Sequence, residues 1–417
     1  MNEPMNVGLL GYGTVGAAVA RLLAEHADEV ARRAGVPVAI ARIAVRDPNK
    51  ARDFAADPSI VTSDPAEVVA DPAIDVVVEV MGGTDPAAAL VLQAIANKKH
   101  VVTANKELLS TSGREVMRAA EAAGVDLLFE ASVAGGIPIV RPLRESLAGD
   151  RVRRIIGIVN GTTNFVLTRM SEMGEDFASA LAEATRLGYA EADPAADIDG
   201  HDAAAKIAIL ASLAFDARVV ASDVAREGIA RITRPDIAAA HQLGYEVKLL
   251  AMAELDDDEI STRVGPAMVP RTHPLAAVRD VFNAVFVEAV QAGELMFLGR
   301  GAGGAPTASA VVGDIVEVAR NAREGARTPS YIGFHADARL RSEAEMRTRY
   351  YVVLSVTDQP GVLAEVASTF ARHGVSIASV RQEGAGDEAT LMLVTHISTV
   401  GSQRATFADL AALAVVR

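Results

Sequence analysis

Short apolar runs alternate with helical patterns along the first third of the chain. The runs have the length and composition of buried strands and cover residues 6–10, 38–45, 74–80, 100–103 and 125–129. Helical patterns separate them, near residues 51–54, 87–97 and 113–123. Strands that alternate with helices build a parallel sheet with helices on both faces. We therefore predict an α/β fold that opens with a doubly wound parallel sheet over residues 1–131.

The alternation stops after residue 131. A turn-rich junction at 132–138 leads into strands and helices of mixed order, which predicts an α+β domain over residues 132–299. A second glycine cluster then precedes a helical pattern at 308–321. We expect residues from about 300 to 327 to complete the first domain.

The C-terminal part has its own organisation. Residues 328–349 are polar and rich in Arg and Glu, which is typical of a linker. Residues 350–417 follow the order βαββα, with strands at 351–356, 375–382 and 389–397 and helices at 362–373 and 404–413. A further strand would start near residue 415, so we expect this unit to be truncated or its edge to be completed by another chain.

Composition narrows the class of protein. Half of the 417 residues are hydrophobic, enough for two or three domains with sizeable cores. The net charge of -14 argues against a nucleic-acid or anionic-membrane partner. No stretch resembles a signal peptide or a membrane helix, and we expect a cytoplasmic protein. The absence of cysteine excludes disulfides, thiolate metal sites and thiol nucleophiles.

A G-x-G-x-x-G motif, residues 11–16, follows the first strand. Its glycines let the backbone approach a pyrophosphate at a helix N-terminus in a sheet of Rossmann type, although such a turn can be purely structural. The second strand ends at Arg46 and Asp47. An arginine there would hold the 2′-phosphate of NADP, whereas an acid would hold the ribose of NAD. Because Arg46 comes first, NADP is favoured, with a solvated strand-end charge as the alternative.

The segment from Gly188 to Leu210 concentrates acidic residues ahead of a helix with a single lysine. The acids are Glu191, Asp193, Asp197, Asp199 and Asp202. Lys206 is the only charged residue from Ala203 to Phe215, so we expect it to be partly buried. It shares a helix face with Asp202, four residues earlier. The segment predicts a site for a small cationic substrate with a proton donor beside it.

Other interpretations of this segment stay open. Asp202 and Lys206 could form a solvated ion pair, with Asp199 as the helix N-cap. The acids before Asp199 could be loop residues or ligands of a divalent metal, although His201 is the only histidine near them.

A second lysine, Lys106, follows the apolar strand at 100–103. Ligands bind at this carboxyl edge in open α/β sheets, so Lys106 could contact cofactor or substrate, or could lie on the surface at a helix start. Oxidising an aldehyde to an acyl product needs a thiol, which the chain lacks. Hydride transfer between a carbonyl and an alcohol, or between an imine and an amine, needs only orientation and a proton donor.

Five segments together resemble homoserine dehydrogenase, and the likeness covers essentially the whole chain. The segments are GYAEADPAADIDGHDAAAK at 188–206, TANKELL at 103–109, EASVAGGIP at 130–138, NGTTNFVL at 160–167 and GRGAGGAPTASAVVGD at 299–314. The resemblance implies NAD(P)-dependent interconversion of L-aspartate 4-semialdehyde and L-homoserine. That reaction belongs to threonine, methionine and isoleucine biosynthesis.

The resemblance also implies roles for individual residues. Lys206 matches the catalytic proton donor, and Lys106 matches the lysine where nicotinamide and substrate meet. Gly188, Glu191 and Asp202 match the groups that bind the amino acid substrate. The positions implied for the cofactor are Gly11, Gly13, Thr14, Val15, Gly16, Arg46, Lys106 and Gly303. The family also binds a monovalent cation, usually sodium, mainly through backbone carbonyls, and the matching residues are Glu130, Val133, Gly135 and Ile137.

Residues 350–417 resemble an ACT domain, a small βαββαβ module that binds amino acids and often pairs with another copy. The turn at 358–361 matches its ligand loop, which makes L-threonine the expected effector. The resemblance implies a homodimer formed through the strand-rich middle domain. Two other functions stay open: an L-aspartate dehydrogenase-like enzyme acting on an imine, and an amino acid sensor without turnover.

Overall fold

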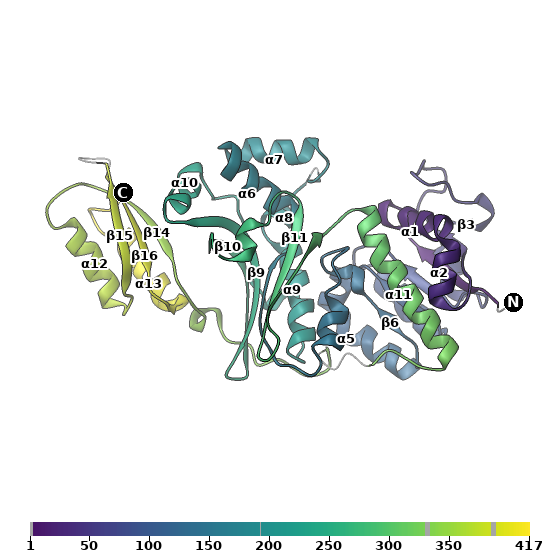
Figure 1. Ribbon diagram of the computed structural model, residues 1–417. Coiled ribbons are helices and arrows are strands. Elements are labelled where there is room, and N and C mark those ends of the chain that lie inside the picture. The colour runs from purple at the N-terminus through teal and green to yellow at the C-terminus, as the bar shows by residue number, and fades with distance from the viewer. Residues whose placement is uncertain (1–2, 192, 330–333, 385–388) are drawn as a thin grey trace. The chain divides into compact units, whose positions relative to one another are not determined.

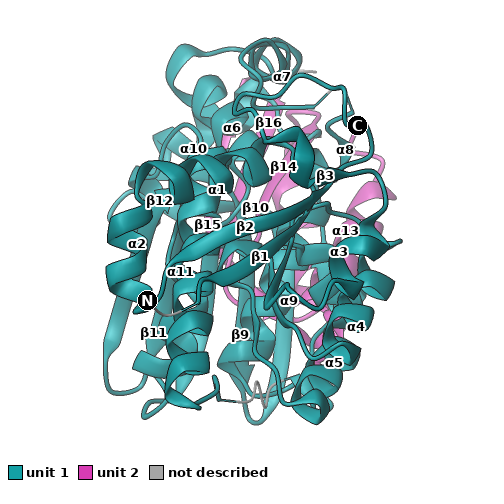
Figure 2. Cartoon of the chain, turned by 90° about the vertical axis from the view of Figure 1, so that its right-hand side faces the viewer, with its two compact units in different colours: residues 1–338 teal, residues 339–417 magenta. Residues whose placement is uncertain are grey.

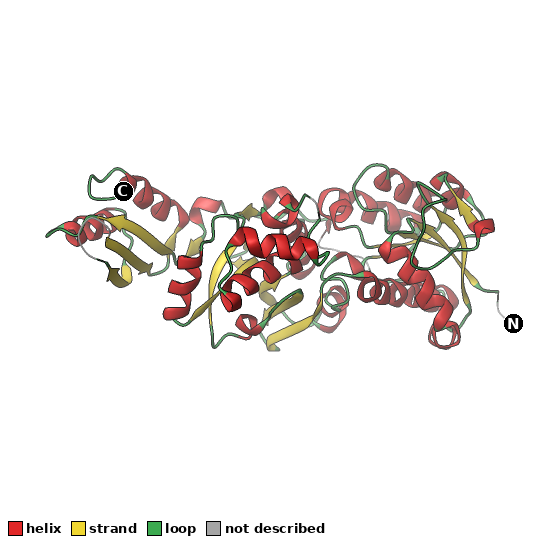
Figure 3. Cartoon of the chain, turned by 90° about the horizontal axis from the view of Figure 1, so that it is seen from above, coloured by secondary structure: helices red, strands yellow, loops and turns green. Residues whose placement is uncertain are grey.

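The computed structural model describes residues 3–191, 193–329, 334–384 and 389–417. The chain divides into two units, residues 1–338 and 339–417, which Figure 2 shows in different colours. The boundary between them falls inside the polar stretch at 328–349. Helices and strands occur along the whole chain, as Figure 3 shows by colour, and the α/β class is confirmed.

Six parallel strands form the first sheet, in the order β3-β2-β1-β4-β5-β6. Their bounds are β1 Met5–Leu10, β2 Val38–Ala44, β3 Val61–Thr62, β4 Val76–Glu79, β5 His100–Thr103 and β6 Leu127–Leu128. Successive side chains of a strand point to opposite faces. Val76 and Val78 of β4 accordingly belong to one apolar cluster and Val77 to the other, so the sheet is buried on both faces as predicted.

Helices cover both faces of this sheet. One face packs against α1 Thr14–Glu25, α2 Ala27–Ala34 and α11 Gly304–Glu324, and the other against α3 Pro65–Ala70, α4 Ala87–Ala96 and α5 Lys106–Ala123. Helix α11 lies beside α1 although some 290 residues separate their starts (Figure 1). The chain therefore returns to the first sheet after building the second.

The second sheet has the order β12-β11-β7-β9-β10-β8 and is antiparallel except for the β8–β10 pair. Its strands are β7 Val152–Ile158, β8 Ala225–Arg226, β9 Tyr245–Asp256, β10 Glu259–Pro270, β11 Phe282–Ala289 and β12 Gly293–Arg300. The helices of this part are α6 Gly161–Met173, α7 Phe177–Arg186, α8 Ala195–Ile198, α9 His201–Ala214 and α10 Arg234–Gln242. This mixed arrangement agrees with the predicted α+β region.

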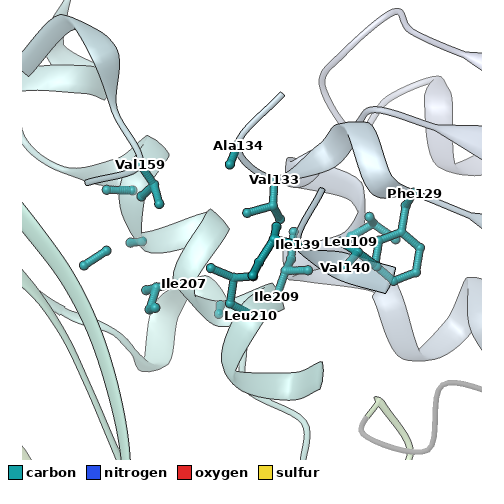
Figure 4. Close-up of a cluster of buried hydrophobic side chains, with 14 of the residues drawn as sticks. Leu109, Phe129, Val133, Ala134, Ile139, Val140, Val159, Ile207, Ile209 and Leu210 are labelled. Carbon is teal, nitrogen blue, oxygen red and sulfur yellow. The ribbon is translucent and has the colours of Figure 1, made fainter. Parts of the chain in front are cut away.

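The larger apolar core of unit 1 is continuous between its two sheets. It includes Leu109 of α5, Phe129 directly after β6 in the sequence, and Ile139 at the junction (Figure 4). It also includes Ile207 and Leu210 of α9, and all five residues are at most 2% exposed. Helices α5 and α9 are in direct contact. This packing fixes the start of α5, which carries Lys106, relative to the helix that carries Lys206.

Unit 2 has the antiparallel sheet β14-β16-β15 and its own apolar cluster. Its elements are β13 Arg347–Thr348, β14 Tyr351–Val356, α12 Val362–Arg372, β15 Ile377–Glu383, β16 Ala389–Thr395, β17 Ser398–Thr399 and α13 Val400–Ala411. The last residues pair with the free edge of β14, since Val356 bridges Val416 and the Arg417 N–H donates to the Ser355 carbonyl at 3.0 Å. The chain's own end thus supplies the beginning of a fourth strand.

None of the described helices combines the length and the apolar content that a membrane crossing requires.

Candidate active site

The glycine motif forms the turn between β1 and α1. Gly11 has φ +104°, and a Cβ there would lie 2.9 Å from the Val80 carbonyl oxygen. A Cβ on Gly16 would lie 2.3 Å from the Gly11 carbonyl oxygen, whereas one on Gly13 would meet no atom within 4 Å. Gly11 and Gly16 therefore permit the tight turn, and Gly13 leaves open space at the start of α1. This is the cradle that a pyrophosphate needs.

A second helix N-terminus lies beside the first. Gly303 is the N-cap of α11 with φ +110°, and a Cβ on Gly304 would lie 2.9 Å from the Thr14 carbonyl oxygen. Thr14 is exposed and Val15 is partly exposed. Helix N-termini carry free N–H groups and positive partial charge, so this pair favours an anionic group.

The loop after β2 folds back onto the glycine turn through Arg52. Its guanidinium donates to the carbonyls of Tyr12 at 3.0 Å and Asp47 at 2.6 Å, and it lies 5.9 Å from the Tyr12 ring centre. Arg46 is exposed at the start of this loop. The helix predicted at 51–54 is wrong, because these residues form a loop held by the Arg52 side chain.

Lys106 is the first residue of α5. Asn105 caps this helix by accepting a hydrogen bond from the Leu108 N–H at 3.0 Å. The Lys106 ammonium lies 3.3 Å from Asp202 Oδ1 of α9, and the Lys106 side chain is 32% exposed. The surface-lysine interpretation is therefore not supported.

Lys206 lies on α9, with its side chain 12% exposed. Its ammonium donates to Asp202 Oδ2 and to the Val159 carbonyl, both at 2.7 Å. Asn160, which follows Val159 and caps α6, donates to Asp202 Oδ2 at 2.9 Å. One carboxylate thus holds two lysines and an amide from three separate segments, and Lys206 is partly buried as predicted.

The charges of this cluster stabilise one another. Burial raises the pKa of the Asp202 carboxyl, but Lys206 and Lys106 outweigh burial and hold this pKa at about 2, below its ordinary 3.8. Burial lowers the pKa of the Lys106 ammonium, but Asp202 outweighs it and raises that pKa above its ordinary value. Asp202 is therefore ionised and Lys106 charged at neutral pH, and a solvated surface pair does not describe them.

The acidic loop before α9 is less closely tied to this cluster. Gly188 has φ +77° with open space around it, and Glu191 and Asp193 are exposed. Asp197 accepts from the Asn160 amide at 2.6 Å and so reaches the same network.

Two expectations for this segment need correction. Asp199 is not the N-cap of α9, because Gly200 takes that position with φ +80° while Asp199 ends α8. Within the described residues, no group of three or more His, Cys, Asp or Glu is placed to hold a metal ion. The divalent-metal interpretation of the loop acids therefore has no support.

The loop matched to a monovalent cation lies at the junction of the two sheets. Ala134 and Gly135 both have positive φ, +56° and +52°, and the Gly136 N–H donates to the Arg300 carbonyl at 3.1 Å. The buried Glu130 carboxylate accepts from the backbone N–H groups of residues 139–141 at 2.6 to 2.9 Å. These three bonds direct the Glu130 carboxylate toward the backbone of residues 139–141.

Family models match three parts of the chain. The model described as homoserine dehydrogenase matches residues 138–316, and the model for the NAD-binding domain of homoserine dehydrogenase matches residues 11–130. The ACT domain model matches residues 350–414. Among curated proteins, the homoserine dehydrogenase of Corynebacterium glutamicum is 51% identical over 397 residues, covering 94% of this chain and 89% of its own. That of Mycobacterium tuberculosis is 52% identical over 408 residues, covering 95% and 92%.

The chain belongs to the homoserine dehydrogenase family.

Solved structures agree with this assignment. A homoserine dehydrogenase from Thiobacillus denitrificans matches with a TM-score of 0.95 and 42% identity over 100% of this chain and 96% of its own. A hyperthermophilic archaeal homoserine dehydrogenase in complex with NADPH matches with a TM-score of 0.64 and 30% identity over 76% and 98%. The chain is therefore an oxidoreductase with an NAD-binding domain and an ACT domain, and the L-aspartate dehydrogenase and sensor alternatives are not favoured.

Sequence reasoning missed two groups of this site. Asn160 was visible only as part of the NGTTNFVL segment, yet its amide bridges Asp197 and Asp202. Arg52 had no local signal, because its partners are backbone carbonyls. The predicted residues Lys106, Asp202 and Lys206 do come together, and Gly11, Gly13, Gly16 and Gly303 gather at the two helix N-termini.

Proposed function

We propose that the Lys106–Asp202–Lys206 cluster catalyses the interconversion of L-aspartate 4-semialdehyde and L-homoserine in threonine, methionine and isoleucine biosynthesis. The observation that supports this most is the shared carboxylate, which holds lysines from the first sheet's edge and from α9 within 3.3 Å. Reduction of an aldehyde develops negative charge on its oxygen, and two fixed cations stabilise that charge.

Lys206 is the proposed proton donor. An ammonium has three N–H donors, and Val159 and Asp202 accept two of them, which leaves one for the substrate oxygen. In the opposite direction the neutral amine would accept the alcohol proton. A bound nicotinamide supplies or accepts the hydride at the neighbouring carbon. Lys106 would polarise the oxygen, while Asp202, Glu191 and the Gly188 backbone would hold the substrate ammonium.

NADP(H) is the proposed cofactor, preferred over NAD(H). The open cradle at Gly13 and the paired N-termini of α1 and α11 fit a dinucleotide pyrophosphate. Arg46 is exposed at the end of β2, where a 2′-phosphate would lie in such a sheet. Arg52 keeps that loop against the glycine turn and would support the same position.

A monovalent cation, sodium, is the proposed resident ion of the junction loop. The left-handed turn at Ala134 and Gly135 displays backbone carbonyls, and within the described residues no hydrogen bond to the carbonyls of Val133, Gly135 or Ile137 is recorded. Hard oxygen donors of this kind suit Na⁺, and Glu130 would contribute its carbonyl. Bound there, the ion would stiffen the junction that sets Lys106 against Lys206.

L-threonine is the proposed effector at the ACT domain, through the loop at 358–361, and a homodimer is the proposed assembly. The support for the effector is the match of residues 350–414 to the ACT family, and the support for a homodimer through the strand-rich middle domain is the match to the homoserine dehydrogenase family.

One assay tests the proposed function. NADPH oxidation is followed with L-aspartate 4-semialdehyde, repeated with NADH, with Na⁺ replaced by choline, and with added L-threonine. We expect turnover with NADPH to exceed that with NADH, and activity to fall without Na⁺ and with threonine. Absence of turnover with either cofactor would count against the function itself, whereas equal turnover with both would remove only the NADP preference.

A further inference from the structure

Glu79 is a buried carboxyl in the centre of the first sheet. It is the last residue of β4, between β1 and β5, and its side chain is 0% exposed. Within the described residues it forms no ion pair, and burial raises the pKa of its carboxyl above the ordinary value. Burying such a group is unfavourable unless hydrogen bonds satisfy it, so its partners indicate why it is there.

Those partners lie in two loops on the ligand-binding edge of the sheet. Glu79 Oε1 accepts from the backbone N–H groups of Met81 at 2.8 Å and Gly82 at 3.3 Å. Glu79 Oε2 accepts from the Thr103 hydroxyl at 2.7 Å. One side chain thus joins the loop after β4 to the end of β5.

The network continues from Thr103 to the start of α5. Thr103 Oγ1 accepts from the Asn105 N–H at 3.0 Å. The Asn105 amide donates to the Gly83 carbonyl at 2.6 Å, and its oxygen caps α5. Lys106 is the next residue, so its position depends on a chain of hydrogen bonds that begins at Glu79. The same bonds hold the loop at 81–83, which lies next to Gly11 of the cofactor turn.

We propose that Glu79 is a positioning residue that fixes Lys106 and the loop at 81–83 for hydride transfer. The inference rests on the proposed role of Lys106. All of the recorded hydrogen bonds to Glu79 point toward its oxygens, which an ionised carboxylate accepts without rearrangement. A glutamine could still accept from Met81 and Gly82, but its amide nitrogen would donate to Thr103 Oγ1, and the hydroxyl proton would then lose the acceptor that Glu79 provides. Glu79→Gln therefore weakens the link to Lys106, because it leaves the Thr103 hydroxyl proton without its acceptor, and it preserves the size of the side chain.

The test is a double-mutant cycle between Glu79→Gln and Lys106→Met. We expect Glu79→Gln to lower kcat roughly 10- to 100-fold, as small misplacements at a reacting centre do, with the KM for NADPH changed less than about threefold. Added to Lys106→Met, it should lower kcat by less than about twofold, because the residue it positions is gone. Losses that multiply in the double variant would overturn the proposal.

Controls separate positioning from stability. Lys99 is buried at the other end of β5 and donates to the carbonyls of Asp71 and Ile74. Lys99→Met therefore removes buried hydrogen bonds just before the same strand and away from the site, and it should lower the melting temperature while kcat stays near wild type. An equal kcat loss in Lys99→Met would assign the effect of Glu79 to stability.

A second pair of variants covers the case in which Glu79→Gln does not fold. Thr103→Ser keeps the hydroxyl and should retain kcat, whereas Thr103→Val removes it and should show the same non-additivity with Lys106→Met. Equal kcat in the two would overturn the proposal. Wild-type turnover is measured first: an inactive wild type would overturn the proposed function together with this inference, whereas additive losses in an active wild type would overturn the role of Glu79 alone.

Discussion

Lys206→Ala is the substitution that most directly tests the chemistry. The side chain is 12% exposed and bridges Val159 and Asp202, so its removal takes away the proposed proton donor and leaves a largely enclosed cavity. General acid catalysis of this kind contributes roughly 10²- to 10⁴-fold. At about 1.36 kcal/mol for each tenfold, the barrier should rise by about 3 to 5 kcal/mol. Lys106 remains 3.3 Å from Asp202, so the carboxylate keeps one counter-ion and the fold should persist.

The assay measures kcat in both directions, together with NADPH affinity from the fluorescence of the bound cofactor. We expect kcat to fall by about 10²- to 10⁴-fold and the NADPH dissociation constant to change less than about twofold, because the cofactor cradle lies on other elements. Small primary amines such as methylamine should enter the cavity and restore part of the activity. Lys206→Met fills that space and should not respond to them.

Lys98→Ala provides the matched control. Lys98 is exposed at the turn before β5, and its ammonium donates only to the Ala123 carbonyl in the described part of the chain. Its loss should leave kcat unchanged. Near-wild-type turnover in Lys206→Ala, or equal amine rescue of Lys206→Ala and Lys206→Met, would refute the assignment of Lys206 as proton donor.

Three further outcomes follow from the charges and from the cofactor loop. The fall of the Asp202 pKa from 3.8 to about 2 corresponds to about 2 kcal/mol, so Asp202→Asn should lower the unfolding free energy by about that amount above pH 4, and the difference should disappear as the pH falls through 2. Lys248 is buried beside Asn164 and the Val278 carbonyl, and burial lowers its pKa from 10.5 to about 8. The charged form of Lys248 therefore destabilises the fold below pH 8. Between pH 8 and 10.5, the unfolding free energy of the wild type should rise by up to about 3 kcal/mol relative to that of Lys248→Met, which denaturation at several pH values measures. Arg46→Ala should raise the KM for NADPH about tenfold and leave that for NADH unchanged, and a parallel rise in both would show that Arg46 does not contact the 2′-phosphate.

The fold was largely predictable because its signals are local. Strands of a doubly wound sheet are buried on both faces, so each one appears in the sequence as a continuous apolar run. β4 and β5 accordingly lie almost where these runs predict them. The helix prediction for residues 51–54 was wrong for the opposite reason, because the conformation of this segment depends on the contact of Arg52 with Tyr12, forty residues away. The prediction that Asp199 caps α9 was wrong because Gly200, with its positive φ, separates α8 from α9 and is the N-cap.

The site was predictable where a charge stands out from its neighbours, and not where the contact spans the chain. Lys206 could be singled out as a lone cation in an apolar helix. That Lys106 would share Asp202 with it could not be derived from spacing, since 96 residues separate Lys106 from Asp202 and only the packing of α5 on α9 brings them together. Asn160 shows the same limit, because its role depends on where α6 begins relative to α9.

Glu79 extends this argument. It is one of two acids in the apolar run at 74–80, with Asp75 near the start of that run, so the reasoning that selected Lys206 extends to it. The two charges differ in what neutralises them. Lys206 donates to Val159 and Asp202 and keeps a third N–H for a substrate oxygen. The Glu79 carboxylate instead accepts hydrogen bonds from Met81, Gly82 and Thr103. A lone charge in an apolar segment therefore indicates a constrained position, and only the count of its satisfied hydrogen bonds separates a group that reacts from one that holds a reacting group in place.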